Sequence, residues 1–229
     1  MHRIWNLAFA PIAVVLSAQV PFEQLDPLAR AEAKDIVRRA DFAFQTGTAP
    51  KRVRLATMDQ LFDHPRLAAA MWRHCQFVPM FFIFQEANGT WSMDDTKGLH
   101  GTIHPVLKKP GLRVYIVEGR AVRGRLKTPF AVGAKLVVVY RYWEGPNGFE
   151  TNLQTWTAMD SAILGFVSKP FHSHIRHQQD GLIAYINRNI LLFGEFADLD
   201  PQEFEDPLKR EGDPIATRDF EQIFSRKIH

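Results

Sequence analysis

Residues 112–122 read LRVYIVEGRAV, and residues 134–143 read AKLVVVYRYW. Both runs are rich in the β-branched and aromatic residues that favour β-strands. A turn at Gly145–Gly148 leads into a third run, FETNLQTWTAM at 149–159. Because these strands are joined by loops and tight turns rather than by helices, they predict a mainly antiparallel meander.

The central strands of this meander are apolar on both faces. In the first of them Val114 and Ile116 point to one side, and Tyr115 and Val117 point to the other, because side chains alternate along a strand. A sheet of this kind is covered on both sides, or it is strongly curved with one side wrapped around a helix.

Further strands are expected on the N-terminal side of the meander. An aromatic run at 77–86 ends at Asn88–Gly89, a dipeptide typical of a tight hairpin. The return strand would be 90–93, and the next strand would be 99–106. A turn at Pro110–Gly111 then leads into the central strands, so the meander begins near residue 77.

A long amphipathic helix is expected after the last strand. Its apolar residues recur at intervals of three, four and seven, which places them in one stripe along about six helical turns. The stripe consists of Phe171, Ile175, Leu182, Ile186, Ile190 and Phe193. Polar Gln178 or Gln179 occupies the position where the stripe is interrupted, and Gly194 is expected to end the helix.

The N-terminal part of the chain predicts mainly helices. The first, at 27–44, begins with Asp26 as its N-cap and a proline in its first position. Two short helices are expected at 58–62 and 65–74, and a brief strand at Val53–Leu55. At the other end, residues 197–229 are charged and interrupted by prolines, so we expect a peripheral tail with a short helix at 217–224.

The first eighteen residues predict a secretory signal peptide. Arg3 is followed by an apolar run from Ile4 to Ala18 that is too short for a transmembrane helix, which needs about 20 apolar residues. We therefore expect an exported protein, periplasmic or secreted. A retained membrane-tethered N-terminus and a buried helix stay open as alternatives. The single Cys75 allows no intrachain disulfide, which fits a bacterial export setting.

Composition excludes several classes of function. The net charge is +3, from 28 basic and 25 acidic residues, and no basic stripe with interleaved aromatic residues is present, so no nucleic-acid partner is expected. The sequence has no Gly-x-Ser-x-Gly elbow, no P-loop and no dinucleotide fingerprint. The rest of the chain, about 210 residues, suits one large domain. The full chain has 18 Phe and five Trp, and such aromatic residues can build a deep core or line a ligand cavity.

This order of elements resembles the START-like superfamily, also called SRPBCC or helix-grip domains. Two local features carry the resemblance: the two short helices broken at Asp63–Pro65, and the long helix after the strand that contains Trp156. The resemblance implies an α+β fold in which a curved antiparallel sheet wraps around the C-terminal helix and leaves a cavity for an apolar ligand. The helix at 27–44 is an addition, and Val53–Leu55 would be the first strand of the family fold.

These expectations divide the chain into four parts. Residues 1–18 form the signal peptide, and 19–50 form the N-terminal helix and a linker. Residues 51–196 form the START-like domain, and 197–229 form the charged tail.

The histidines are the first candidates for chemistry. His100 and His104 lie four apart in a predicted strand and so share a face, where Asp94 or Asp95 could join them around a metal. The alternative, two histidines that face solvent or form hydrogen bonds, is favoured, and no metal site is assigned. On the long helix, His174 and His177 flank the apolar stripe, where one of them could bind the polar head of a ligand.

The sequence favours a carrier that holds a lipid or another apolar small molecule between the sheet and the long helix. No cofactor is expected, and no catalytic residue is assigned. The residues expected to line the ligand are Trp91, His104, Tyr115, Tyr140, Trp156, Phe171, His174 and Ile175. Two alternatives remain: an enzyme that uses a cavity histidine such as His104 or His174, and a structural or interaction protein with a filled core.

A transient contact with a membrane surface is a further expectation. The basic face of the long helix, which includes Lys169, His172, Arg176 and His177, could touch anionic headgroups. Oligomeric state is left open.

Overall fold

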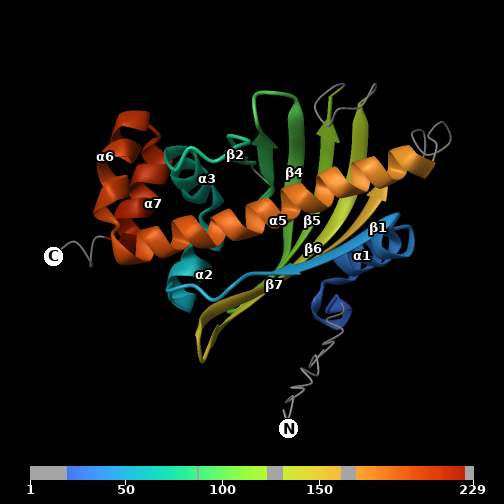
Figure 1. Ribbon diagram of the computed structural model, residues 1–229, viewed down its shortest axis with the longest axis horizontal. Helices are drawn as coiled ribbons and strands as arrows, with labels where there is room; N and C mark the ends of the chain where they lie inside the picture. Colours follow the sequence, from blue (N-terminus) through green and yellow to red (C-terminus); the bar gives the residue numbers. More distant parts are fainter. Residues whose placement is uncertain (1–19, 87, 123–130, 161–168, 225–229) are drawn as a thin grey trace, which may run out of the picture.

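A computed structural model describes residues 20–86, 88–122, 131–160 and 169–224, with side chains in these ranges except those of 169–172. Its core is one seven-stranded antiparallel sheet in the order β1-β7-β6-β5-β4-β3-β2 (Figure 1). The strands are β1 (Phe42–Gly47), β2 (Phe82–Gln85), β3 (Trp91–Asp94), β4 (Leu99–Lys109), β5 (Leu112–Ala121), β6 (Val132–Gly145) and β7 (Gly148–Met159).

The long helix α5 (Lys169–Leu199) crosses the concave face of this sheet, as Figure 1 shows. The expected α+β fold is confirmed: a curved antiparallel sheet around a long C-terminal helix, with an additional N-terminal helix α1 (Pro27–Arg38). The helix α5 continues past Gly181 and Gly194, so the expected end at Gly194 is wrong. A Cβ on Gly194 would lie 2.6 Å from the Sδ atom of Met58, so this glycine lets α5 approach α2 (Leu55–Asp63) closely.

The first strand corrects the expected helix at 27–44. Asp26 caps α1, since its Oδ1 accepts from the backbone N–H groups of Leu28 and Ala29 at 3.0 Å. The helix ends at Arg38, and Phe42–Gly47 forms β1, which pairs with β7. The first strand is therefore β1 and not Val53–Leu55, where α2 begins instead.

The aromatic run at 77–86 is a strand only in its last part, β2. Pro79 has no N–H for a sheet ladder. The carbonyl groups that precede β2 are used by α3 (Pro65–His74) instead: Trp72 Nε1 donates to the oxygen of Pro79 at 2.7 Å, and Arg73 donates to the oxygen of Phe81. The segment before β2 thus packs against a helix.

The two faces of the sheet have different covers. Helix α1 packs its Ala33 and Ile36 on the outer face, against β5 and β6 residues that include Ile116 and Val137. The concave face meets α5, α2 and α3. Within the described part of the chain, no helix is both long and apolar enough to cross a membrane.

The C-terminal residues are not a peripheral tail. They form α6 (Gln202–Glu211) and α7 (Pro214–Phe224), which pack on α3. Phe204, Leu208, Phe220 and Phe224 are all buried in the same core as the concave face of the sheet. Each pair lies four residues apart, so each helix has one apolar face beneath its charged surface.

Candidate ligand-binding site

Helix α5 stands off from the middle of the sheet. Its closest backbone approaches are to β1, α2 and α3, and among the described residues it makes none of comparable extent to β4, β5 or β6. The intervening distance is spanned by side chains. The packing of these side chains divides the helix–sheet interior into a filled half and a partly open half.

The filled half lies under the C-terminal part of α5 and is packed with aromatic rings. Phe62 of α2 meets Tyr140 and Tyr142 of β6, with ring centroids 4.9 and 5.1 Å apart. Tyr142 also contacts Phe149, and Trp72 contacts Phe193 of α5. These rings are buried or nearly so, which leaves this half as ordinary core.

A charged network closes the filled half at its outer end. Arg113 of β5 is buried, and its Nη2 lies 3.0 Å from Oδ1 of Asp59 and 3.4 Å from Oδ1 of Asp63. Tyr142 donates its hydroxyl to Asp59 as well. Burial and this hydrogen bond raise the pKa of Tyr142. The network fixes α2 to the sheet and provides no free charge to the interior.

The partly open half lies under the first half of α5. Val117 on β5 faces Ile103 on β4 and Leu136 on β6, and all three side chains are only half-buried. Opposite them on α5, Ile183 and Ile186 are half-buried too. A Cβ added to Gly119, two residues beyond Val117, would meet no atom closer than 3.9 Å. Apolar side chains of both α5 and the sheet thus keep part of their surface exposed, although Ile183 and Ile186 also pack against the edge of the aromatic core.

A few polar groups border the open half. Gln179 Nε2 donates to Thr157 Oγ1 at 2.6 Å, which ties α5 to β7. Tyr140 donates its hydroxyl to Asn187 Oδ1 at 2.7 Å, and burial raises the pKa of Tyr140. The Oγ1 of Thr155 is buried with no hydrogen-bond partner among the described residues. A bound molecule that faces this part of β7 would find a polar strip within an apolar surface.

The structure brings four of the eight expected ligand-lining residues to the concave side. Trp91 and Tyr115 lie on that face with ring centroids 6.1 Å apart. Tyr140 lies between the two halves. Ile175 of α5 is buried against Phe42 of β1. Their contact with a ligand stays a prediction.

His104 and Trp156 must be removed from the expected set. Four residues lie in one row across neighbouring strands, each directly opposite the next: His104, Ile116, Val137 and Trp156. Directly opposed residues share a face, and Ile116 and Val137 belong to the outer cluster under α1. Both residues therefore point away from α5.

The other two expected residues lie on α5. The side chain of Phe171 falls outside the described residues. His174 is half-buried and already interacts with neighbouring groups. The basic face expected to contact membranes rests partly on Lys169 and His172, whose side chains also fall outside the described residues.

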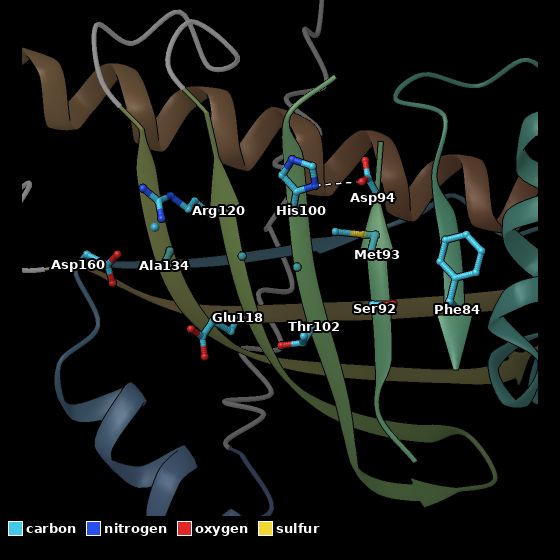
Figure 2. Close-up of a pocket in the computed structure, with 13 residues that line it drawn as sticks. Phe84, Ser92, Met93, Asp94, His100, Thr102, Glu118, Arg120, Ala134 and Asp160 are labelled. Atoms are coloured by element: carbon cyan, nitrogen blue, oxygen red, sulfur yellow. Dashed lines mark hydrogen bonds and ion pairs between the residues drawn. The ribbon is translucent and has the colours of Figure 1, made fainter. Parts of the chain in front are cut away.

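Of the two expected histidines of β4, only His100 lines an outer-face groove, which Figure 2 shows. This groove has a volume of about 670 Å³, and His100 Nδ1 lies 3.0 Å from Oδ2 of Asp94 within it. Among the described residues, no group of three or more His, Cys, Asp or Glu side chains is placed to hold a metal ion. Glu118 and Arg120 from β5 make the groove polar.

Sequence reasoning missed the polar strip of the interior except at one point. The interruption of the apolar stripe at 178–179 marked Gln179, which the structure shows donating to Thr157. Asn187 had no such mark, because it follows Ile186 within an otherwise regular apolar pattern. Thr155 and Thr157 were parts of a strand rich in threonine.

No protein-family model and no curated protein matches the sequence. Three solved structures show a distant similarity to this chain. An uncharacterized protein from Rhizobium leguminosarum aligns at a TM-score of 0.44 and 13% identity, over 67% of this chain and 94% of that one. Ara h 8.0201 aligns at a TM-score of 0.39 and 11% identity, over 66% of this chain and 97% of that one. The di-domain ARO/CYC protein BexL aligns at a TM-score of 0.40 and 12% identity, over 75% of this chain and 55% of that one. The helix-grip arrangement itself stands on the sheet and α5 described above.

Proposed function

We propose that this protein binds a lipid or another apolar small molecule between α5 and the concave face of the sheet. The binding region is the partly open half, bordered by Ile103, Val117 and Leu136 of the sheet and by Ile183 and Ile186 of α5. One observation carries the proposal: these facing apolar side chains stay half-buried while the neighbouring half of the same interior is filled. Covering them with an apolar ligand would remove this surface from water.

The polar strip on β7 supports a ligand with one polar group. Thr155 Oγ1 has no partner among the described residues, and a buried hydroxyl without a partner is costly. A ligand oxygen or nitrogen near Thr155 and Gln179 would supply that partner. The remainder of the ligand would contact only apolar side chains, as expected for a carrier of apolar molecules.

Export is a separate part of the proposal. It rests on the pattern of residues 1–18, which lie outside the described residues. Expression in a bacterium with sequencing of the N-terminus tests it. A mature chain in the periplasm that begins at Gln19 supports export, and an intact Met1 in the cytoplasm contradicts it.

A matched pair of variants on β5 tests the binding site. Val117 faces the interior, and Glu118, the next residue, is exposed on the other face. Val117→Phe fills the open half, so we expect it to weaken binding of 1-anilinonaphthalene-8-sulfonate by about tenfold, as measured by fluorescence titration. Glu118→Phe adds the same ring to the outer face and should leave the affinity unchanged.

Native mass spectrometry of the wild-type protein completes this test. An apolar molecule that copurifies and is absent from Val117→Phe supports the proposal. If both variants bind the dye equally and nothing apolar copurifies, the interior is not a ligand site, and the alternative of a filled structural core is favoured. Thermal melts show that each variant is folded.

A further inference from the structure

A second groove lies outside the helix–sheet interior. It has a volume of about 680 Å³ and is formed by the α2–α3 junction, the β2–β3 hairpin and α7. Ile83, Trp91 and Ile215 give it apolar walls. We call it the hairpin groove. It is separate from the proposed ligand site, because none of the five residues that border that site lines the groove.

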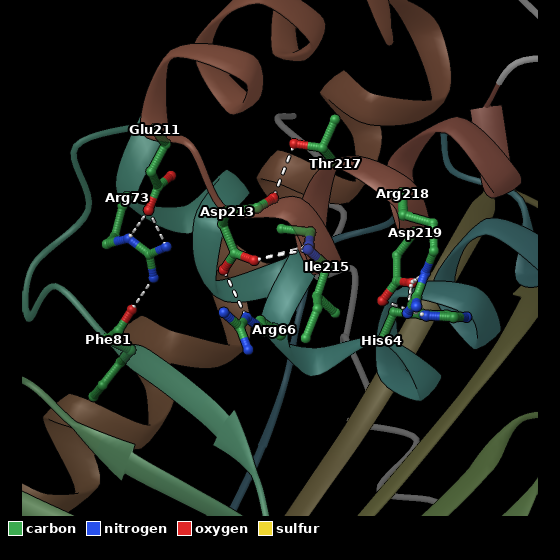
Figure 3. Close-up of polar contacts among 11 residues, drawn as sticks. His64, Arg66, Arg73, Phe81, Glu211, Asp213, Ile215, Thr217, Arg218 and Asp219 are labelled. Carbon is green, nitrogen blue, oxygen red and sulfur yellow. Dashed lines mark hydrogen bonds and ion pairs between the residues drawn. The ribbon is translucent and has the colours of Figure 1, made fainter.

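A histidine–carboxylate pair lines the hairpin groove. His64 Nδ1 lies 2.9 Å from Oδ2 of Asp219, and Asp219 also accepts from Arg218 at 2.9 Å (Figure 3). The Asp219 side chain is 8% exposed, so this carboxylate is held inside the protein. A carboxylate accepts hydrogen bonds, so in the neutral imidazole Nδ1 carries the proton and Nε2 presents its lone pair. Nε2 has no partner among the described residues, and the His64 side chain is 23% exposed.

The cationic side chains of the groove are already paired. Arg66 Nε lies 2.6 Å from Oδ2 of Asp213, and Lys108 Nζ lies 3.7 Å from Oδ1 of Asp63. Arg218 is paired with Asp219. The groove therefore offers an anionic ligand no cation without a partner, and a neutral molecule fits its electrostatics better.

The pair is more than a tie between helices. Two other ion pairs join α3 to the same C-terminal hairpin, Arg66 with Asp213 and Arg73 with Glu211 (Figure 3). These do not need His64. A structural tie would use Nδ1 alone, whereas His64 also lines a groove with apolar walls and keeps part of its side chain exposed.

We propose that His64, oriented by Asp219, is the hydrogen-bond acceptor of a second binding site, and that this site takes the hydroxyl group of a small neutral molecule. The ligand O–H donates to Nε2, and the apolar part of the ligand lies along Ile83, Trp91 and Ile215. Asp219 fixes the imidazole in the tautomer that can accept. This proposal goes beyond the interior site and does not depend on it.

The test compares two probes of similar shape, 2-naphthol and 2-methoxynaphthalene. Only the first can donate a hydrogen bond. We expect the wild-type protein to bind 2-naphthol about tenfold more tightly, the effect of one hydrogen bond. His64→Phe keeps an aromatic ring at this position but has no hydrogen-bond acceptor, so the preference for 2-naphthol should disappear. Arg73→Gln breaks a neighbouring tie outside the groove and should keep the preference.

Two results would overturn the proposal. Equal affinity of the wild-type protein for both probes shows that no protein acceptor forms a hydrogen bond with the hydroxyl of 2-naphthol. A preference that survives in His64→Phe shows that another group binds the hydroxyl. Val117→Phe distinguishes this site from the interior, and we expect it to keep the preference for 2-naphthol. If Val117→Phe abolishes the preference, the hydroxyl is bound in the interior and His64 does not bind it.

Discussion

At the scale of single residues, two threonines on β7 differ in one respect. Thr157 accepts a hydrogen bond from Gln179 of α5, whereas the buried Thr155 hydroxyl has no partner among the described residues. Both side chains point to the concave face, two residues apart. A buried hydroxyl without a partner costs stability, and a partnered one contributes to it.

We therefore expect Thr155→Val and Thr157→Val to have opposite effects on the unliganded protein. Thr155→Val should raise the free energy of unfolding by about 1 kcal/mol, because it removes an unsatisfied group. Thr157→Val should lower it by about 1 kcal/mol, because it leaves Gln179 without its acceptor. Urea unfolding followed by circular dichroism measures both. A loss of stability in Thr155→Val would mean that its hydroxyl has a partner, and the polar strip would not be vacant for a ligand.

At the scale of elements, α5 contains two glycines in different surroundings. A Cβ on Gly181 would meet no atom within 4 Å, whereas a Cβ on Gly194 would press on Met58 of α2. Gly181→Ala should stabilise the protein by up to about 1 kcal/mol through helix propensity. Gly194→Ala should destabilise it by about 1 kcal/mol, because the fully buried Met58 must move. Thermal and urea unfolding of the two variants test this; a gain in Gly194→Ala would show that α2 and α5 are not closely packed there.

The N-terminus of α7 gives the fold a dependence on pH. Burial opposes ionisation of Asp213, but hydrogen bonds from Arg66 and from the backbone of Ala216 and Ile215 outweigh it and lower the pKa of Asp213 below its usual 3.8. A carboxyl group with a lowered folded-state pKa stabilises the fold above its ordinary pKa, and this contribution is lost as the pH falls through that value towards the folded-state pKa.

Asp213→Asn should therefore destabilise the protein at pH 7, and this loss relative to the wild type should shrink as the pH falls below 3.8 towards the folded-state pKa. Unfolding curves at several pH values measure the difference. Lys209→Met, which breaks a surface pair with Glu205, is the control and should leave stability nearly unchanged at every pH. An equal loss for Asp213→Asn at both extremes of pH would assign its effect to packing.

Elements differ in how well the sequence predicts them. The strands β5, β6 and β7 and the helix α5 have long, regular patterns, and their positions follow from periodicity. β1 is short and follows helix-favouring residues without a break, so Phe42 and Phe44 were assigned to the helix. The many charged residues of α6 and α7 led to the prediction of a peripheral tail. A few apolar residues on one face of each helix are nevertheless enough to pack it into the core.

Site residues were less predictable than elements. Alternation along a strand shows which residues share a face, but the sequence does not show which face meets α5. His104 and Trp156 were placed on the wrong side for this reason. The pair of His64 and Asp219 joins distant parts of the chain through the packing of α7 on α3, and no local pattern announces it.

At the scale of the whole molecule, the fold is a sheet with one cover on each face and an interior that is filled at one end. The ion pairs among α3, α6 and α7 hold the filled end together, and α5 spans both ends. The proposed interior site and the hairpin groove therefore share one scaffold but are lined by different residues. Occupancy of either can be measured without the other.

The pairing of β1 with β7 has a consequence for how the chain acquires its fold. This ladder joins Phe42 to Thr157, so one edge of the sheet lacks its neighbour until almost all the strands have been synthesised. The helix α1 also lacks its packing partners until then, since they lie on β5, β6 and β7. Contacts between such distant segments make folding slow, and a nascent chain halted before β7 would keep its first strand unpaired and prone to association with other chains.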